Sequence, residues 1–418
     1  MNNYKQAKSI SEKAYPKESL MVIPDEWWKT EPEEYDFGMF ISDLMAKEHP
    51  EIAKEKSEDH LRFLAGKLTA ELLQRELREN RDKNIILSPF SILSLVSVAA
   101  FSAAGKTKEE ILRTFGFGEI APVLLELQTA LSKTHRLFSA NAVCVQEKYS
   151  PFIRREYREK LKQHFKGEVF SSENIVGDVN RWVSKKTRGM IPSVLDESTE
   201  VIDACMMNAV AFEDRWMDNY DDDDIRDDEF VNSDKSRSTV RMMSGREEDY
   251  IEDPDFTGFV KPYRRGDFSF LALLPKKEGP LYTGKMPDFS TLFRNRSEAI
   301  VLVKIPEFQC SSGIDLTDYL KDKGLQTAFT PSADFSPVAT FPLRFEKIAQ
   351  KAHIEVDRNG TKAAAVTCIE MVGAGFPPVS KINRVYLDRP FYYAIIHNHS
   401  AMPVFAGAVN ALPSITDA

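Results

Sequence analysis

Cysteine is scarce in this chain, and its spacing excludes the sites that cysteine most often builds. The four cysteines are Cys144, Cys205, Cys310 and Cys368. They lie far apart, with no Cys-x-x-Cys pair and no metal-ligand spacing to any of the seven histidines. We therefore expect free thiols and no metal site, which fits either a reducing compartment or a large secreted domain that does not depend on disulfides.

Long apolar runs are also missing. No stretch approaches the roughly 18 to 20 uninterrupted apolar residues of a membrane helix, and residues 1–6 are too polar to begin a secretory signal. We expect no membrane span. An extracellular or cell-surface location, with a signal that is not visible here, is the expectation, and a cytoplasmic location is the alternative.

Positive charge and catalytic motifs are in short supply as well. The chain has 55 Lys and Arg against 64 Asp and Glu, a net charge of −9, which argues against nucleic acid because phosphate binding needs a basic surface. The sequence contains no Gly-x-Ser-x-Gly, no His-Glu-x-x-His and no dinucleotide-binding fingerprint. We expect neither an enzyme nor a cofactor, and the partner is more plausibly a protein or a small molecule.

Three short motifs have plain interpretations. The 105–107 segment, Gly-Lys-Thr, lacks the earlier glycine of a phosphate loop and is predicted to be a turn that ends a helix. The acidic run 221–224 lacks the spacing of a calcium loop and is predicted to be a solvated loop. His397 and His399 have no visible third ligand and are predicted to be surface histidines.

By composition, a polar first part precedes a mixed remainder. Residues 1–58 are rich in Lys, Glu and Asp, so we interpret them as an extension, with a partner-binding arm carrying Trp27 and Trp28 as the alternative. Residues 59–418 are long enough to bury a large core.

Hydrophobic periodicity in residues 59–418 indicates helices and strands without a regular alternation. A helical pattern starts at Leu61. A short apolar strand is predicted at 85–91, and its last residue, Ser91, is placed to cap the helix that follows. Further helices are predicted at 122–132 and 151–165, and buried strands at 141–145, 203–212, 268–274 and 300–305. Because there is no βαβ alternation and no internal repeat, the predicted fold class is α+β.

The segment 360–378 combines features of a loop and of a strand. It is a long connection between strand-like stretches at 351–356 and 384–387, and such connections usually have a function. Alternate positions from Thr361 are uncharged and mostly small, while both charges, Lys362 and Glu370, lie in the other phase. The pattern predicts a segment that is a loop in one state and a strand in another, but an ordinary edge strand with a Gly/Pro turn would fit it equally well.

From about residue 61 to residue 413 the chain resembles the serpin family. The motifs that carry the resemblance are Asn84 with 88–91, similar to the shutter motif; 179–183 with 187–191, similar to the helix F signature; 208–212 with Trp216, similar to a strand and the breach tryptophan; and the closing 403–410. The resemblance implies a large central, mostly antiparallel sheet with two further sheets, about eight or nine helices and an exposed reactive-centre loop at 358–380.

The resemblance also implies a mechanism. In that family a protease cleaves the loop, the hinge inserts as a new strand, and the acyl-linked protease is carried away with a distorted, inactive triad. The implied hinge consists of Gly360, Thr361, Ala363, Ala364, Ala365 and Val366. The implied scissile bond joins Ala374 to Gly375, within a recognition stretch of Met371, Val372, Gly373, Ala374, Gly375 and Phe376. The implied shutter and breach residues are Ser88, Ser91, Asn208 and Trp216.

Two positions depart from the family pattern. Arg358 stands where a Glu is usual, so the breach ion pair typical of relatives is not expected, and Gln350 stands at the shutter His position. Both bear on how firmly the metastable state is held. The departures favour a prokaryotic member.

The loop chemistry indicates the target. No Lys or Arg lies between Ala363 and Ser380, so a protease with an acidic specificity pocket has nothing to bind. Ala374 suits an elastase-like or subtilisin-like serine protease, which we expect to be held covalently by a monomeric inhibitor. Cleavage after Glu370, Met371 or Val372 would indicate other specificities. A non-inhibitory carrier or chaperone, and an inhibitor of cysteine proteases, are the alternatives.

Overall fold

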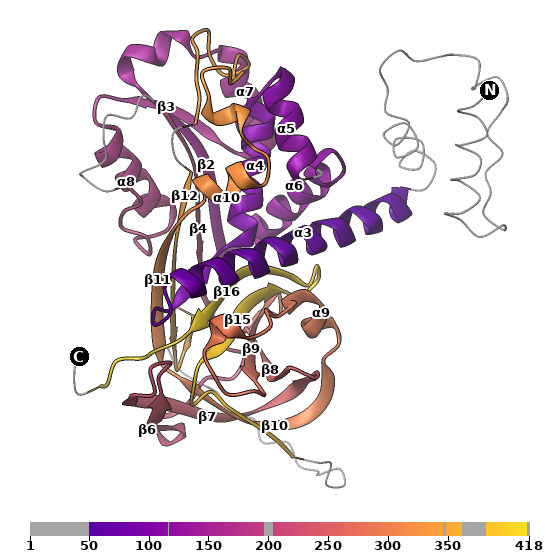
Figure 1. Ribbon diagram of the computed structural model, residues 1–418, viewed down its shortest axis with the longest axis vertical. Helices are drawn as coiled ribbons and strands as arrows, with labels where there is room; N and C mark the ends of the chain where they lie inside the picture. Colours follow the sequence, from indigo (N-terminus) through magenta and orange to yellow (C-terminus); the bar gives the residue numbers. More distant parts are fainter. Residues whose placement is uncertain (1–49, 116, 196–203, 346–347, 362–381, 416–418) are drawn as a thin grey trace, which may run out of the picture. The chain divides into compact units, whose positions relative to one another are not determined.

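The computed structural model describes residues 50–115, 117–195, 204–345, 348–361 and 382–415. The chain divides into two compact units, Met1–Lys56 and Ser57–Ala418, and the arrangement below is that of the second (Figure 1). The helices of the described ranges are α3 (Pro50–Glu79), α4 (Pro89–Ser102), α5 (Gly105–Phe115), α6 (Phe117–Thr134), α7 (Arg155–Phe165), α8 (Ile175–Lys186), α9 (Phe289–Arg294) and α10 (Thr317–Asp322). None of the helices searched there is long and apolar enough to cross a membrane.

Helix α4 lies at the centre of the core and is buried on every side. Its serines can be buried because Ser94, Ser97 and Ser102 each donate a hydrogen bond to the carbonyl four residues earlier. The predicted cap at Ser91 was wrong, because the Oγ of Ser88 accepts the hydrogen bond from the Ser91 backbone N–H at 3.1 Å. The strand predicted at 85–91 is therefore shorter, Ile85–Leu87, and the helix begins at Pro89, where a proline ring fits the first turn.

Nine strands form one continuous sheet, which we call the closed sheet. In spatial order they are β1 (Ile85–Leu87), β16 (Met402–Val409), β15 (Phe391–His397), β9 (Phe268–Pro275), β8 (Phe256–Pro262), β7 (Arg237–Glu252), β10 (Ser297–Pro306) and β14 (Asn383–Tyr386), with β6 (Ile225–Val231) also paired with β7. β15 and β16 are buried along their whole length. Gly407 permits the close approach of β1 and β16, because a Cβ there would lie 2.3 Å from the Ile85 carbonyl oxygen.

The other strands form two ladders, which together we call the divided sheet. One ladder is β11 (Phe308–Asp315), β12 (Ala349–Asp357), β13 (Gly360–Thr361) and β5 (Asp214–Arg215), and the other is β3 (Glu168–Ser172), β2 (Leu137–Gln146) and β4 (Ala204–Phe212). The chain passes directly from one ladder to the other, because β4 ends at Phe212 and β5 begins at Asp214. In the described ranges β4 pairs with β2, β12 pairs with β11 and β13, and no ladder joins β4 to β12.

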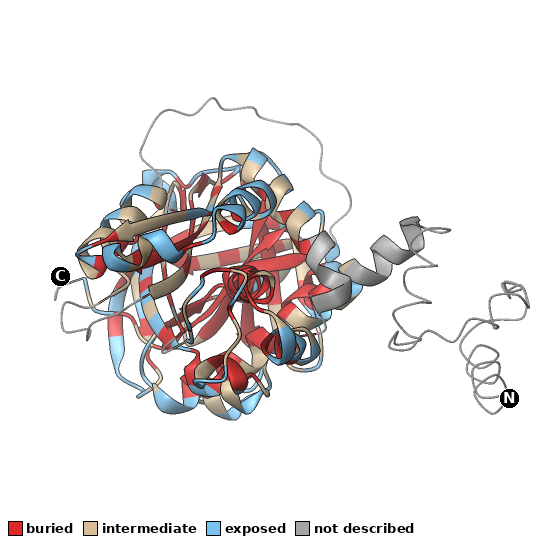
Figure 2. Ribbon diagram, turned by 90° about the horizontal axis from the view of Figure 1, so that it is seen from above, coloured by how far each residue is buried: buried red, intermediate tan, exposed pale blue. Residues whose placement is uncertain are grey.

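Two layers of helices cover the divided sheet. Helix α8 packs its buried Ile175, Val179 and Val183 against one face of β2 and β4, while α4 packs on the opposite face within the main core. Figure 1 shows α8 on one side of these strands and α4 to α7 on the other. In Figure 2 the buried residues fill the centre of this unit. The division between β4 and β12 therefore lies in a sheet that is covered by helices.

Most predicted strands are confirmed, and two helical predictions need correction. β2, β4, β9 and β10 contain the predicted strands, apart from residue 203, and α6 contains the predicted helix at 122–132. The predicted helix at 151–165 is instead a 3-10 turn, Glu147–Phe152, followed by α7 from Arg155. The 105–107 segment, predicted to be a turn that ends a helix, instead forms the first turn of α5 and lies two residues beyond the end of α4.

The predictions for cysteine and histidine had different outcomes. Cys144, Cys205 and Cys310 are free thiols, as expected, and Cys144 lies directly opposite Cys205 in the β2–β4 pair. Cys368 lies outside the described residues. The prediction of two surface histidines was wrong for His397, which ends β15 and is 8% exposed, whereas His399 is exposed. Burial lowers the pKa of His397 to about 4.

Candidate functional site

A polar cluster connects the two sides of the divided sheet at one end. The Ser91 Oγ donates to the Asn208 Oδ1 of β4 at 2.5 Å, and the Asn208 amide donates to the Asn141 Oδ1 of β2 at 2.9 Å. On the other side, the Gln350 side chain of β12 bonds to the backbone of Ser88. We call Ser88, Ser91, Asn208 and Gln350 the polar bridge. It joins β4 to β12 through the start of α4, and no strand ladder joins these two strands within the described ranges.

Gln350 is the firmest contact of this bridge. Its Oε1 accepts from the Ser88 backbone N–H at 2.9 Å, and its Nε2 donates to the Ser88 carbonyl oxygen at 2.8 Å. A neutral histidine also offers one donor and one acceptor, so the amide supplies the same pair of functions. The departure at this position therefore leaves Ser88 fully satisfied.

At the other end of the division, β13 lies between the two sides. Gly360 pairs with Asp357 of β12 and with Arg215 of β5, and Thr361 pairs with Val356 and Asp214. Gly360 has a φ of +152°, and a Cβ at this position would lie 2.2 Å from the Asp214 carbonyl oxygen. The start of the predicted hinge is thus a short strand that only glycine allows at its first position.

The aromatic side chains of Tyr263 and Trp216 anchor β13 and the residues just before it. Thr361 is 1% exposed, and its hydroxyl shares a 2.6 Å hydrogen bond with the hydroxyl of Tyr263. Tyr263 stacks on Trp216 with ring centroids 4.7 Å apart, and the indole N–H of Trp216 donates to the Asp357 carbonyl oxygen at 2.9 Å. Burial raises the pKa of Tyr263 far above its ordinary value, so its hydroxyl keeps its proton.

The turn between β12 and β13 is anchored by one carboxylate and two backbone groups. Asp357 Oδ1 accepts from the backbone N–H groups of Asn359 at 2.7 Å and Gly360 at 3.1 Å. The Asn359 carbonyl oxygen in turn accepts from the Trp216 backbone N–H at 3.0 Å. The residues that precede the hinge are therefore fixed by hydrogen bonds on both sides.

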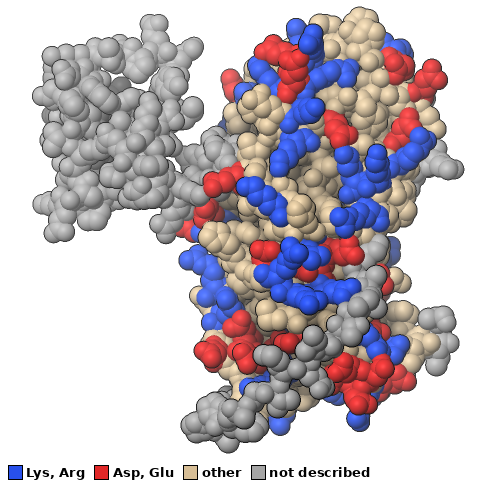
Figure 3. Space-filling model, turned by 180° about the vertical axis from the view of Figure 1, so that it is seen from behind, with Lys and Arg blue, Asp and Glu red and all other residues tan. Residues whose placement is uncertain are grey.

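Arg358, in the same turn, cannot form the ion pair that a Glu would form here, but it forms a different one. Its guanidinium bonds to the Asp222 carboxylate, and its Nε lies 4.0 Å from Glu307 Oε1. Asp222 raises the pKa of Arg358, and Arg358 lowers the pKa of Asp222. The polarity is reversed: the cation is next to the hinge and the anions lie on the neighbouring elements. Acidic residues gather at the lower right of Figure 3, at the end of the molecule where Figure 1 places β6.

The closed sheet supports the same aromatic group through a buried ion pair. Lys261 of β8 and Glu247 of β7 are both almost fully buried, and their charged atoms lie 2.8 Å apart. The Lys261 ammonium lies 4.5 Å from the centre of the Tyr220 ring and 5.5 Å from that of Trp216. Trp216 is thus packed against a fixed cation of the closed sheet.

The structure brings together some of the predicted site residues and not others. Ser88, Ser91 and Asn208 meet in the polar bridge, and Gly360, Thr361 and Trp216 meet at the other end. The remaining hinge residues Ala363, Ala364, Ala365 and Val366, the recognition stretch Met371, Val372, Gly373 and Phe376, and the bond between Ala374 and Gly375 lie outside the described residues. Sequence reasoning missed Tyr263 and Asp357, because nothing in their surroundings distinguishes them from other strand-end residues.

Comparison with known proteins agrees with this geometry. The family model for the serpin, described as a serine protease inhibitor, matches residues 64–412. The chain belongs to the serpin family, whose members are named as protease inhibitors rather than as enzymes.

Relatives with this fold come from distant organisms. The chain is 30% identical to Serpin-Z1B of Triticum aestivum, covering 78% of this chain and 89% of that protein, and 30% identical to leukocyte elastase inhibitor A of Mus musculus, covering 81% and 96%. The native thermophilic serpin tengpin is 29% identical, with a TM-score of 0.72 over 84% of this chain and 94% of that one. Human thyroxine-binding globulin shares the fold at 24% identity, with a TM-score of 0.76 over 86% and 100%.

Proposed function

We propose that this protein is a suicide-type inhibitor of serine proteases, which traps the acyl-enzyme by inserting its cleaved loop between β4 and β12. The observation that supports the proposal most directly is β13. Gly360 and Thr361 already pair with strands on both sides of the division, and among the described residues no ladder joins the facing edges of β4 and β12. Strand addition there would supply backbone partners to both edges at once.

The burial of Thr361 indicates which side chains would enter. Because side chains alternate along a strand, the residues two and four positions after Thr361 would take the same buried phase. These are Ala363 and Ala365, which are small, whereas Lys362 would take the other phase. The hinge is therefore suited to join the divided sheet without burying a charge.

The proposed chemistry is an acyl transfer that stops half-way. The protease serine oxygen attacks the Ala374 carbonyl carbon, the peptide bond to Gly375 breaks, and the Gly375 nitrogen leaves with a proton as an amine. The protease is then bound to Ala374 as an ester. Insertion of the preceding residues would move that ester away from Gly375 and distort the protease triad before water can cleave it.

The closed sheet would hold the other product of cleavage. β14, β15 and β16 all follow the proposed scissile bond, and all three are strands of the closed sheet. The segment after Gly375 would therefore stay with the protein in the absence of denaturant. Only the loop before Ala374 would be free to move.

We propose an elastase-like or subtilisin-like target, because Ala374 is small and apolar and the loop around it lacks Lys and Arg. The proposal includes residues 1–58 as an extension, 59–418 as the inhibitory domain with a reactive loop at 358–380, a monomeric protein and an extracellular or cell-surface location. A carrier or chaperone role is the second candidate, and the small-residue hinge speaks against it. Inhibition of a cysteine protease is a further alternative.

The test is to incubate the full chain separately with pancreatic elastase, subtilisin and trypsin, and to analyse the products on denaturing gels. We expect an SDS-resistant complex with at least one of the first two proteases and none with trypsin. A mass spectrum of the C-terminal fragment, expected to begin at Gly375, would locate the bond. Clean cleavage by elastase and subtilisin with no stable complex would overturn the inhibitory function and favour the carrier role.

A further inference from the structure

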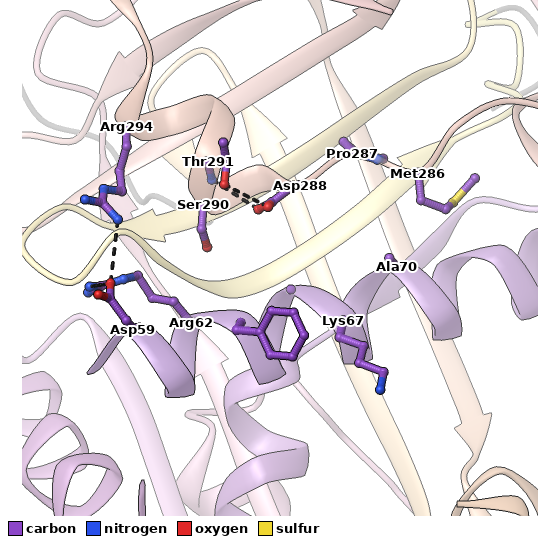
Figure 4. A pocket seen from close by; sticks show the side chains of 12 residues that line it. Asp59, Arg62, Lys67, Ala70, Met286, Pro287, Asp288, Ser290, Thr291 and Arg294 are labelled. Atoms are coloured by element: carbon purple, nitrogen blue, oxygen red, sulfur yellow. Dashed lines mark hydrogen bonds and ion pairs between the residues drawn. The ribbon is translucent and has the colours of Figure 1, made fainter. Parts of the chain in front are cut away.

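Two of the free thiols lie side by side in the divided sheet, and the proposed inhibitory function does not use them. Cys144 of β2 and Cys205 of β4 are direct partners in the antiparallel β2–β4 ladder. Neither residue belongs to the polar bridge or to β13. They are also separate from the cavity of about 360 Å³ between α3 and the segment that leads into α9 (Figure 4), whose walls contain no cysteine.

The two cysteines lie on the same face of the sheet. Residues directly opposite one another in a ladder share a face, and both cysteines pack in the small apolar cluster that contains Val179 and Val183 of α8. The neighbouring Val143 and Val145, in the other phase of β2, belong instead to the main core. Helix α8 therefore packs over both thiols.

The register brings the two residues within the span of a disulfide. Directly opposite residues of antiparallel strands have Cα atoms about 4.5 or 5.5 Å apart, depending on the kind of pair. Both separations fall inside the range of about 4.4 to 6.8 Å over which disulfides are found. The sulfur of Cys205 also accepts a hydrogen bond from the backbone of Cys144. A bond between the two sulfurs therefore needs rotation of side chains and no change of register.

Cys310 shows the contrasting case of a buried thiol without a second thiol opposite it. It is 3% exposed, and its partner in the β11–β12 ladder is Ile354. Its thiol forms a hydrogen bond with the side chain of Tyr393. Cys310 is therefore a matched control for the pair, because it shares the burial of Cys144 and lacks the neighbouring sulfur.

Solvent reaches one member of the pair more readily than the other. Cys144 is fully buried, whereas Cys205 is partly exposed. Burial raises the pKa of Cys144 to about 12, with Asp178 acting in the same direction, and burial also raises the pKa of Cys205. Because the thiolate is the reactive form, we expect oxidation to begin at Cys205 and to be slow at neutral pH.

We propose that Cys144 and Cys205 form a dithiol modification site, which hydrogen peroxide converts into a reversible cross-strand disulfide. The Cys205 thiolate attacks one peroxide oxygen, the O–O bond breaks, and Cys205 becomes a sulfenic acid while hydroxide leaves and takes up the proton that the thiol lost. The Cys144 sulfur then attacks the Cys205 sulfur, the S–O bond breaks, and the oxygen leaves with the Cys144 proton as water. The two thiols lose two electrons, and one peroxide is reduced to two waters.

The disulfide would fasten β4 to β2 beneath α8. It closes the chain between Cys144 and Cys205 and so restricts the unfolded state. It leaves the other edge of β4, which faces β12, unchanged. Oxidation should therefore raise the urea concentration at the midpoint of unfolding, and dithiothreitol should reverse the rise.

The test is to treat the full chain with hydrogen peroxide at about pH 8.5, where more thiolate is present, to alkylate the remaining thiols after denaturation, and to map the peptides by mass spectrometry. We expect Cys144 and Cys205 to escape alkylation together, in one linked peptide pair that has lost two hydrogen atoms. Dithiothreitol should restore both thiols. Oxidation of Cys205 to a sulfinic acid while Cys144 is still alkylated, or alkylation of both after the peroxide is consumed, would overturn the proposal.

Single substitutions separate this pair from the other thiols. Cys144→Ala removes the sulfur that resolves the sulfenic acid, so the peroxide-treated variant should show neither the linked peptide nor the rise in urea midpoint. Cys310→Ala removes another buried thiol and should keep both. A rise in midpoint that persists in Cys144→Ala would overturn the stabilising effect of the disulfide. None of these measurements uses a protease, so their outcome is read separately from that of the inhibitory assay.

Discussion

The closed sheet and the divided sheet differ in how their neighbouring strands are joined. Each strand of the closed sheet pairs with its neighbours through backbone ladders, and β15 and β16 are buried throughout. The divided sheet has ladders on both flanks, but between β4 and β12 the described residues offer only the polar bridge at one end and β13 at the other.

Because of this difference, we expect the closed sheet to resist unfolding and the divided sheet to rearrange more easily. The backbone hydrogen bonds of a buried sheet break only when a large part of the protein unfolds, whereas a few side-chain hydrogen bonds can break one at a time. A fold with one sheet of each kind can rearrange one part while the other keeps the molecule together. The predictions below test whether the two sheets differ in this way, from the largest expected effect to the smallest.

The largest effect should come from a charge in the buried phase of the hinge. Ala363→Arg should convert the inhibitor into a substrate, because insertion would then bury an unpaired guanidinium at a cost of several kcal/mol. Denaturing gels with elastase should show cleavage and no stable complex. Lys362→Arg keeps the charge in the exposed phase and is the control, for which we expect a normal complex. Normal trapping by Ala363→Arg would show that the assigned phase is wrong.

The second effect concerns the polar bridge. Gln350→Ala leaves the buried backbone groups of Ser88 without their partners, which should lower the free energy of unfolding by about 1 to 3 kcal/mol and speed spontaneous loss of inhibitory activity at elevated temperature. Activity remaining after incubation is the readout.

Asn232→Ala provides the matched control for this bridge. Asn232 and Gln350 are each 8% exposed. The Asn232 side chain makes hydrogen bonds to Ser236, Ser238 and Leu412 beside the closed sheet. It should lose similar stability without faster inactivation relative to its unfolding temperature. If both variants inactivate alike, the polar bridge has no special role.

A smaller effect is expected from the reversed ion pair. Arg358 is partly exposed, so Arg358→Gln should cost no more than about 1 kcal/mol of stability. It should nevertheless change the number of inhibitor molecules consumed per protease, because it loosens the turn before the hinge.

Arg389 is the matched control for that change. Its side chain is 29% exposed against 27% for Arg358, and it pairs with Asp388 between two strands of the closed sheet. Arg389→Gln should change stability by a similar amount and leave the stoichiometry unaltered. A stoichiometry that shifts equally in both variants would contradict the comparison.

The smallest effect involves pH and the closed sheet alone. Burial lowers the pKa of His397 to about 4, with the nearby His399 acting in the same direction and Asp267 opposing it. In the unfolded chain the imidazole of His397 has its ordinary pKa of about 6.5. The contribution of neutral His397 to the free energy of unfolding is therefore fully present above that pH. It is lost as the pH drops from about 6.5 to about 4, by about 1 kcal/mol over the first pH unit. Urea midpoints at pH 7.5 and 5.5 should differ less in His397→Gln than in the parent.

Sequence predicted the elements of both sheets well, because burial leaves a local pattern. The runs that became β2, β4, β9 and β10 are apolar over a length typical of strands, and the predicted helices at 61 and 122 have clear periodicity. The resemblance to serpins added the order of the motifs. The start of the helix after β1 was misplaced by three residues, because Ser88 and Ser91 are both good caps.

Pairings at long range could not be predicted in the same way. The sequence indicated that Arg358 cannot form the usual breach ion pair, but it did not indicate the partner that replaces it, Asp222, which comes from an acidic loop 136 positions earlier. Thr361 and Tyr263 are 98 positions apart, and a lone tyrosine at a strand end gives no sign of the hydroxyl it will meet. A sequence pattern shows which face of a strand is buried, but it does not show which strand edge lacks a neighbour.

Trp216 provides an intrinsic fluorescence signal close to the hinge. Its indole ring is buried, stacked on Tyr263, close to the ammonium of Lys261 and hydrogen-bonded to the carbonyl of Asp357 just before the hinge. Any rearrangement of β13 changes the polarity and the quenching groups around that ring. Its emission should therefore change in the same milliseconds in which the loop moves, and stopped-flow mixing with protease could follow it without a label.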